Sequence, residues 1–187
     1  MINDLLLVVT VLDNKLSGNL SSLIGLMTNL IVLGCFSNYL TGTIPTEIGA
    51  LSIIQYLDFS SNKLKGSIPT EFGGLKGART IWLANNALTG TIPSELGALT
   101  ALQNLYLTNN MFTGTVPSEL CNLRLQSFEV DCGAVACDCC TKRCGPLVTP
   151  TSPPLPSQTP PRANQTDSFT LPPAATLPPS GFPTTKL

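Results

Sequence analysis

The stretch Asn86-Ala-Leu-Thr-Gly-Thr-Ile-Pro93 recurs along this 187-residue chain at a fixed interval, and it decides the fold. Its asparagine has an equivalent at one constant spacing, with no insertion or deletion between copies, at Asn14, Asn38, Asn62, Asn86 and Asn110. In each copy an apolar residue follows two positions later and a glycine four positions later. A fixed period of this length is typical of a solenoid, in which each stacked repeat contacts only its neighbours.

The apolar residues of each repeat predict one shared core. In the third copy they are Ile54, Leu57, Phe59, Leu64, Ile68, Phe72 and Leu75. The second copy has Leu30, Leu33, Cys35, Leu40, Ile44, Ile48 and Leu51 at the same positions. Burying seven such side chains contributes roughly 10–20 kcal/mol, whereas ordering the backbone opposes folding by about 1–2 kcal/mol for every residue. One repeat is therefore not stable alone, and neighbouring repeats must stack.

Each repeat also predicts its own secondary structure. Triplets such as Ile81-Trp-Leu83 alternate apolar and outward positions, which is the period of a short strand. The stretch Pro93-Ser-Glu-Leu-Gly97 favours a short helix or 3₁₀ turn, with proline near its start and glycine at its end. The asparagine amide is expected to pair with backbone groups of an interior turn. Parallel strands should line the concave side, with the turns opposite.

The repeat pattern Leu-x-x-Leu-x-x-Leu-x-Leu-x-x-Asn-x-Leu-x-Gly-x-Ile-Pro-x-x-Leu-Gly resembles that of plant-type leucine-rich repeat proteins, over about residues 5–130. The departures are local: Leu20-Ser21 replaces Ile-Pro in the first copy, and Gly77-Ala78 weakens the leucine positions of the fourth. The resemblance implies an α/β repeat, a right-handed leucine-rich repeat solenoid with a parallel concave sheet. It also implies a binding scaffold, as in receptor-like protein ectodomains and polygalacturonase-inhibitor-like proteins.

Three segments are expected along the chain. Residues 1–131 form the solenoid of about five repeats, 132–145 a cysteine-rich cap, and 146–187 a disordered stalk rich in Pro, Ser and Thr. Leu6, Val9 and Val11 are already in phase with the second repeat, so we expect an incomplete first repeat and a chain that is a fragment. The alternative, a secretion signal over Leu5–Leu12, lacks a basic region and a cleavage site.

The last repeat is followed by a cluster of cysteines. They are Cys121, Cys132, Cys137, Cys139, Cys140 and Cys144, which leaves Cys35 in the core as a small apolar residue. Six cysteines predict three disulfides with 15 possible pairings. Such bridges persist in oxidising compartments, so an extracellular or cell-surface location follows. The alternative, a zinc site, is disfavoured because the chain has no histidine and no second cysteine pair at knuckle spacing.

Twelve of the 16 prolines lie after Gly145, in the stalk. Ser and Thr beside Pro also suit O-glycosylation. Asn19 and Asn164 each begin an Asn-x-Ser/Thr sequence, which is the pattern of an N-glycosylation acceptor. No run of 18 apolar residues occurs, so no membrane span is expected in this chain.

Residues that alternate with the core positions should face outward from the concave sheet. Trp82 is the only tryptophan, and Tyr106 occupies the same position in the next repeat. Exposed aromatics on a rigid sheet are candidate anchors for a partner, although aromatic side chains also cover neighbouring strands. The candidate partner-binding residues are Tyr56, Asp58, Trp82, Tyr106 and Thr108. Asp58, with Glu129 and Asp131 near the cap, could add a weak acidic element, although solvated surface charge is the more common interpretation of such residues.

Several functions are not expected. With no histidine, a His-based catalytic triad and a His-ligated protease metal are absent. The recurring Glu47, Glu71, Glu95 and Glu119 indicate structure, since an active site would occur once. Net charge of −1 and 11% charged residues argue against nucleic-acid binding. No catalytic residue, metal or cofactor is therefore predicted.

The expected function is recognition of a protein or peptide, including one associated with carbohydrate, outside the cell or at its surface. A receptor-like ectodomain or secreted binding protein fits best. Two alternatives stay open: a secreted inhibitor of cell-wall-degrading hydrolases, and a structural surface or wall glycoprotein in which the stalk matters most.

Overall fold

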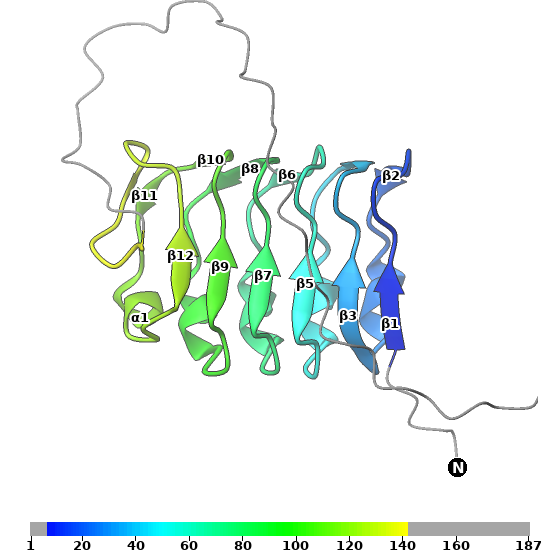
Figure 1. Ribbon diagram of the computed structural model, residues 1–187, viewed down its shortest axis with the longest axis horizontal. Coiled ribbons are helices and arrows are strands. Elements are labelled where there is room, and N and C mark those ends of the chain that lie inside the picture. The colour runs from blue at the N-terminus through cyan, green and yellow to red at the C-terminus, as the bar shows by residue number, and fades with distance from the viewer. Residues whose placement is uncertain (1–6, 142–187) are drawn as a thin grey trace, which may run out of the picture. The chain divides into compact units, whose positions relative to one another are not determined.

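The computed structural model describes residues 7–141, in which successive repeats form the turns of a right-handed solenoid (Figure 1). One strand from each repeat joins a parallel sheet in the order β1-β3-β5-β7-β9-β12. These strands are β1 (Leu7–Thr10), β3 (Leu30–Gly34), β5 (Tyr56–Asp58), β7 (Thr80–Trp82), β9 (Asn104–Tyr106) and β12 (Ser127–Glu129). Equivalent residues pair: Leu57 lies opposite Ile81, and Ile81 lies opposite Leu105. The predicted parallel sheet is therefore confirmed. The stalk predicted over 146–187 lies outside the described residues.

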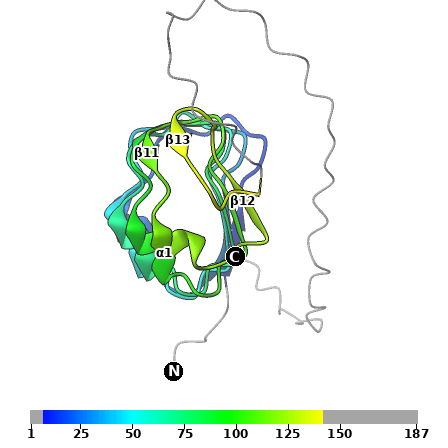
Figure 2. The ribbon, with the colours of Figure 1, turned by 90° about the vertical axis from the view of Figure 1, so that its left-hand side faces the viewer.

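Short strands and helical turns complete each repeat. The strands are β2 (Ser17–Asn19), β4 (Tyr39–Thr41), β6 (Lys65–Gly66), β8 (Ala87–Gly90), β10 (Met111–Phe112), β11 (Gly114–Thr115) and β13 (Val135–Ala136). The 3₁₀ turns are η1 (Ser22–Leu26), η2 (Thr46–Ala50), η3 (Thr70–Gly74) and η4 (Ser94–Ala98), and the helix α1 spans Ser118–Cys121. Each turn after the first follows the repeat proline directly, as the sequence predicts. End-on, α1 lies on the side of the solenoid opposite β12 (Figure 2).

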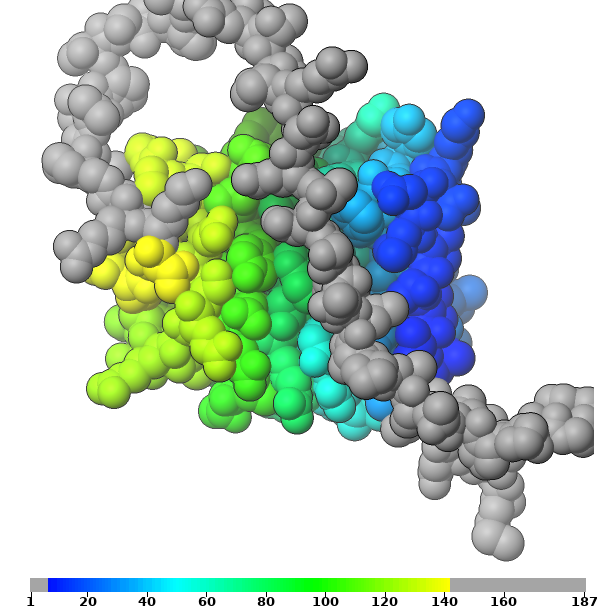
Figure 3. Space-filling view, viewed as in Figure 1, coloured from blue at the N-terminus to red at the C-terminus, as the bar shows by residue number. Residues whose placement is uncertain are grey.

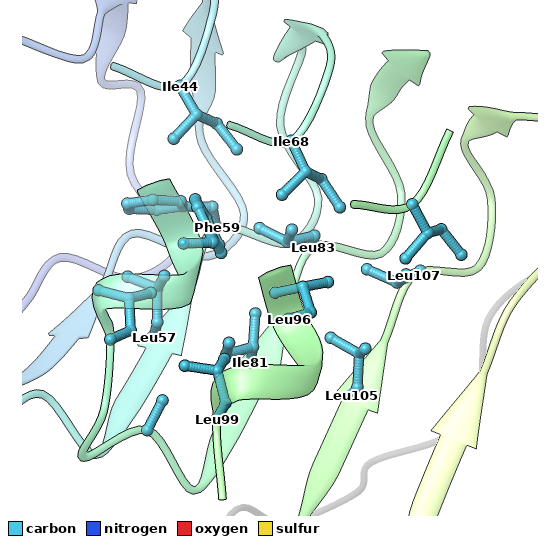
Figure 4. Close-up of a cluster of buried hydrophobic side chains, with 14 of the residues drawn as sticks. Ile44, Leu57, Phe59, Ile68, Ile81, Leu83, Leu96, Leu99, Leu105 and Leu107 are labelled. Carbon is cyan, nitrogen blue, oxygen red and sulfur yellow. The ribbon is translucent and has the colours of Figure 1, made fainter. Parts of the chain in front are cut away.

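The core lies between the large sheet and the helical turns and continues from repeat to repeat (Figure 4). Leu57, Ile81 and Leu105 form one row of equivalent side chains, and each is fully buried. Cys35 is an exception among the predicted core residues, because it is only partly buried and is a free thiol. It belongs to the second repeat, whose preceding neighbour is more exposed than the rest of the solenoid.

The repeated asparagines hold neighbouring repeats together by hydrogen bonds. Asn62 Oδ1 accepts the backbone N–H of Leu40 at 2.9 Å. Asn62 Nδ2 donates to the carbonyl of Cys35 at 2.9 Å and to that of Phe59 at 3.1 Å. Asn38, Asn86 and Asn110 repeat this arrangement between their own neighbours. The bonds satisfy backbone groups that the turns leave inside the solenoid.

The first described repeat is the least buried. Its exposed apolar side chains are Leu7, Val8, Leu12, Leu16, Leu23, Leu26 and Met27. Asn14 is exposed, and its amide donates to the carbonyl of Leu12, two residues away. The asparagine is the same residue in every repeat, but Asn14 makes a different hydrogen bond from the asparagines of the later repeats.

The last repeat shortens by one residue and leads into the cap. At the full repeat spacing the partner of Leu105 would be Glu129, but Leu105 pairs instead with Phe128, one position earlier. Disulfides join Cys121 to Cys139 and Cys137 to Cys140, with Cα–Cα distances of 5.5 and 5.8 Å. Cys132 is also disulfide-bonded, and Cys144 lies outside the described residues. The first bridge ties α1, at the end of the last full repeat, to the segment that follows the sheet.

Candidate functional site

The candidate site is the outward surface of the six-stranded sheet, called the sheet face below. It consists of the residues in each strand whose side chains point outward from the sheet. The residue two positions beyond the last of these, just after the strand, is also included. In chain order these are Val8, Thr10, Leu12, Val32, Gly34, Phe36, Tyr56, Asp58, Ser60, Thr80, Trp82, Ala84, Asn104, Tyr106, Thr108, Ser127, Glu129 and Asp131. Figure 3 shows this side, with the repeats as adjacent bands in chain order.

Trp82 and Tyr106 form a stacked aromatic pair on this face. The two residues are register partners on β7 and β9. Their ring centroids lie 6.0 Å apart, and the ring planes differ by 6°. Both side chains are half-buried, so the pair is packed against the sheet while part of each ring remains in contact with solvent. Offset stacking of this kind stabilises the pair beyond simple burial and fixes the two rings as one surface.

Asp58 lies beside Trp82 as its register partner on β5. Its Oδ1 accepts hydrogen bonds from the backbone N–H of Ser60, at 2.8 Å, and from the Ser60 hydroxyl. Burial raises the pKa of the Asp58 carboxyl above its ordinary value, and the two hydrogen bonds from Ser60 partly oppose this shift. Asp58 also raises the pKa of the Cys35 thiol, after the larger effect of burial. Asp58 is thus a positioned, partly desolvated carboxylate.

Two of the polar outward positions are less accessible than the alternation of the sequence suggests. Thr80 and Ser60 are 4% and 9% exposed. The Asn104 amide donates to the Thr80 hydroxyl at 3.3 Å, and the Ser60 hydroxyl is turned onto Asp58. Polar neighbours on adjacent positions therefore cover both hydroxyls. Among the candidate residues, Tyr56 and Thr108 are half-buried on either side of this covered region.

The cap end of the sheet face carries two further carboxylates. Glu129, on β12, is the register partner of Tyr106. Asp131 follows two residues later, and its carboxylate accepts the backbone N–H groups of Asn109 and Asn110 at 2.8 and 2.9 Å. Asp131 is therefore engaged in closing the last repeat. This structural role was missed from the sequence. In the preceding repeat the N–H groups of Asn85 and Asn86 donate to the backbone carbonyls of Thr108 and Asn109, and Asp131 supplies side-chain acceptors for the equivalent N–H groups of the last repeat.

The opposite side of the solenoid carries the glutamate ladder. Glu47, Glu71, Glu95 and Glu119 each accept a hydrogen bond from the hydroxyl of the preceding Ser or Thr. A shallow hollow of about 500 Å³ lies there, lined by Ser22, Gly25, Leu26, Thr46, Glu47, Gly49, Ala50, Glu71 and Gly74. The repetition of one local contact in each turn after the first indicates a structural feature of the repeat.

Over residues 7–141, no group of three metal-ligating side chains is assembled. Within the same range, no helix has the length and apolar character needed to cross a membrane. Asn19 is exposed, and its side-chain oxygen accepts a hydrogen bond from the Thr41 hydroxyl at 3.1 Å. The second predicted acceptor, Asn164, lies outside the described residues.

Comparison with known proteins agrees with this architecture. The Leucine Rich Repeat family model matches residues 54–75, 78–99 and 101–123. The Arabidopsis receptor kinase HAESA, solved with the peptide hormone IDA and the co-receptor SERK1, is 35% identical over 65% of this chain, with a TM-score of 0.62. The match covers 21% of the HAESA chain, so the present chain spans about a fifth of that relative. No curated protein sequence matches.

Two smaller relatives are matched over most of their own length. The ectodomain of the Arabidopsis thaliana receptor kinase SOBIR1 is 28% identical, with 68% of this chain and 71% of that chain covered and a TM-score of 0.64. A chain of the BIR3–SERK2 complex of Arabidopsis thaliana is 31% identical, with 73% and 72% covered and a TM-score of 0.55. The fold and these relatives point to a binding scaffold. The chain belongs to the leucine-rich repeat family, in its plant-type form.

Proposed function

We propose that this chain is an extracellular recognition scaffold that binds a protein or peptide through the sheet face, with Trp82 and Tyr106 as its anchor. The observation that carries the proposal is the stacked pair, held at 6.0 Å on two adjacent strands of a parallel sheet. Large, ordered aromatic surfaces lose little conformational entropy on binding and dominate many interfaces.

The relatives support the same kind of use. HAESA is a receptor kinase solved with a peptide hormone and a co-receptor, and the plant peptide hormone receptor RGFR1 was solved with RGF2. The peptide hormone and RGF2 are ligands of these relatives, and neither is assigned to this chain. The disulfides of the cap support an extracellular or cell-surface location, because such bridges persist in oxidising compartments.

The test is a binding screen with the full chain immobilised and soluble secreted proteins and synthetic peptide pools as analytes. A genuine partner should lose about tenfold or more in affinity with Trp82→Ala, the scale of an interface hot spot. Tyr39→Ala is the matched control, because Tyr39 is an exposed aromatic on β4, away from the sheet face. Circular dichroism and thermal unfolding confirm that each variant folds. Partners that bind the Trp82→Ala and Tyr39→Ala variants equally well would contradict this proposal.

A further inference from the structure

The aromatic pair on the sheet face lies between two carboxylates. Register pairing places Asp58, Trp82, Tyr106 and Glu129 side by side on four successive strands. Three steps of about 4.8 Å therefore separate the backbones of Asp58 and Glu129, a distance of about 14 Å. The row has a carboxylate at each end and an aromatic surface in the middle.

The charges of the sheet face are of one sign. Its outward positions, as defined above, include three carboxylates and no Lys or Arg. Asp131 is occupied by the backbone of Asn109 and Asn110, so Asp58 and Glu129 are the two that can meet a ligand. Arg79 lies just before β7, at the end of that strand away from Trp82, and is not part of the row.

Both carboxylates are able to accept a cation. Ser60 occupies only Oδ1 of Asp58, and Oδ2 has no hydrogen-bond partner among residues 7–141. Glu129 is half-buried, and no side-chain hydrogen bond engages it in the same range. A half-buried carboxylate beside an aromatic ring is a favourable site for an ammonium or guanidinium group, because the ring face also attracts cations. The chain makes such a contact itself, where Lys63 Nζ lies 5.0 Å from the centre of the Tyr39 ring.

We propose that the row Asp58-Trp82-Tyr106-Glu129 binds an extended peptide segment that crosses the strands and carries Lys or Arg at two positions four residues apart. In an extended chain, residues i, i+2 and i+4 point to the same side, and four residues span about 13–14 Å. The two basic side chains then reach Asp58 and Glu129, and the side chain at i+2 lies on the aromatic pair. The proposal rests on the recognition function above and adds the chemistry and spacing of the ligand.

The experiment uses three labelled peptides of equal length with the full chain. The probe is Gly-Lys-Ser-Leu-Ser-Lys-Gly, with lysines four residues apart. Gly-Lys-Lys-Ser-Leu-Ser-Gly keeps the composition but places the lysines side by side, and Gly-Glu-Ser-Leu-Ser-Glu-Gly reverses the charge. Anisotropy of the label measures affinity, and emission of Trp82, the only tryptophan, reports binding at the row.

The probe should bind about tenfold or more tighter than either control, with a Kd that rises with salt, as expected for partly exposed charge pairs. Asp58→Asn and Glu129→Gln should each weaken the probe about three- to tenfold, on the scale of one charge-assisted contact, and reduce its preference over the adjacent-lysine peptide. Glu95→Gln, on the helical side, is the matched control and should change nothing.

The outcomes separate the two proposals. Equal affinity for the three peptides, or an unchanged Kd in both carboxylate variants, would overturn the charge and spacing of the ligand. If partners from the screen still depend on Trp82 in that case, the recognition function stands without this ligand. Probe binding that leaves Trp82 emission unchanged and survives in Trp82→Ala would also refute the proposal, since the peptide would then lie elsewhere.

Discussion

Replacing Asn62 by alanine should destabilise the solenoid far more than the same replacement at Asn14. Asn62→Ala leaves the N–H of Leu40 without its side-chain acceptor at 2.9 Å, in a buried part of the chain. It also removes the amide hydrogens that reach the carbonyls of Cys35 and Phe59 at 2.9 and 3.1 Å. The replacement therefore affects hydrogen bonds in two neighbouring repeats.

The magnitude follows from these contacts. A stranded, buried N–H costs about 1–3 kcal/mol, and each lost amide donor adds about 0.5–1.5 kcal/mol. Together the loss is about 2–6 kcal/mol, a large part of the roughly 5–15 kcal/mol that stabilises a typical domain. Asn14→Ala removes one hydrogen bond at the exposed surface, to the carbonyl of Leu12. Its effect should stay within about 0.5 kcal/mol.

Urea unfolding of the full chain, followed by circular dichroism, measures both variants. The m-value must match that of the wild type for the free energies to be compared, because repeat proteins can lose cooperativity. Hydrogen exchange provides a local readout: the Leu40 amide should lose protection in Asn62→Ala and keep it in Asn14→Ala. A loss below about 1 kcal/mol for Asn62→Ala, or equal losses for the two variants, would show that the hydrogen-bonded ladder does not hold the repeats together.

Three further predictions concern a carboxyl group, a glycine and a disulfide. Because burial raises the pKa of Asp58, its protonated form stabilises the fold at low pH, and this stability is lost as pH rises through the folded-state pKa. Asp58→Asn should therefore raise Tm at pH 7 and give no gain in Tm near pH 3. A gain in Tm that does not depend on pH would refute this account. Gly49→Ala should cost about 1–3 kcal/mol by urea unfolding, because the new Cβ would meet the backbone oxygen of Glu71 in the next turn; an unchanged midpoint would contradict this. Replacing Cys121 and Cys139 together by serine should lower the unfolding free energy by about 2–4 kcal/mol. Reductant should then lower the unfolding free energy of the variant less than that of the wild type. An equal loss in both proteins would show that other disulfides cause the effect of reductant.

The periodicity of the sequence predicted most of the fold because it fixes the register of the backbone. Once the asparagines follow one another at a constant spacing, every residue has one equivalent in the neighbouring repeat, and equivalent residues pair across parallel strands. The sequence alone therefore places Trp82 and Tyr106 side by side on the sheet face, and the register of β7 and β9 confirms this placement. The 3₁₀ turns after the prolines follow from the same local chemistry.

Side-chain contacts could not be predicted in this way. Alternation places Thr80 outward, yet Asn104 covers it, because burial on a sheet face depends on the sizes and hydrogen bonds of neighbouring side chains. The pairing of Cys121 with Cys139 depends on how the cap folds back on α1, and the sequence allows many pairings. Asp131 accepts the N–H groups of Asn109 and Asn110, whose equivalents Asn85 and Asn86 donate to backbone carbonyls of the next repeat, so a side chain takes the place of backbone acceptors at the end of the solenoid.

The hydrogen bonds of the repeated asparagines are also relevant to recognition, because one of these side chains binds the backbone next to the aromatic pair. Asn110 Nδ2 donates to the carbonyls of Leu83 and Leu107, both at 2.9 Å, and these residues directly follow Trp82 and Tyr106. One amide thus links the backbone beside each ring to that beside the other. These bonds oppose a change in the spacing of the two strands that carry the rings. A surface held in this way loses little entropy when a matching ligand binds, and a ligand with basic groups at another spacing must leave one carboxylate unpaired. If the row binds the basic peptide that we propose, the rigidity that stabilises the repeats should make the sheet face selective for distance as well as for charge.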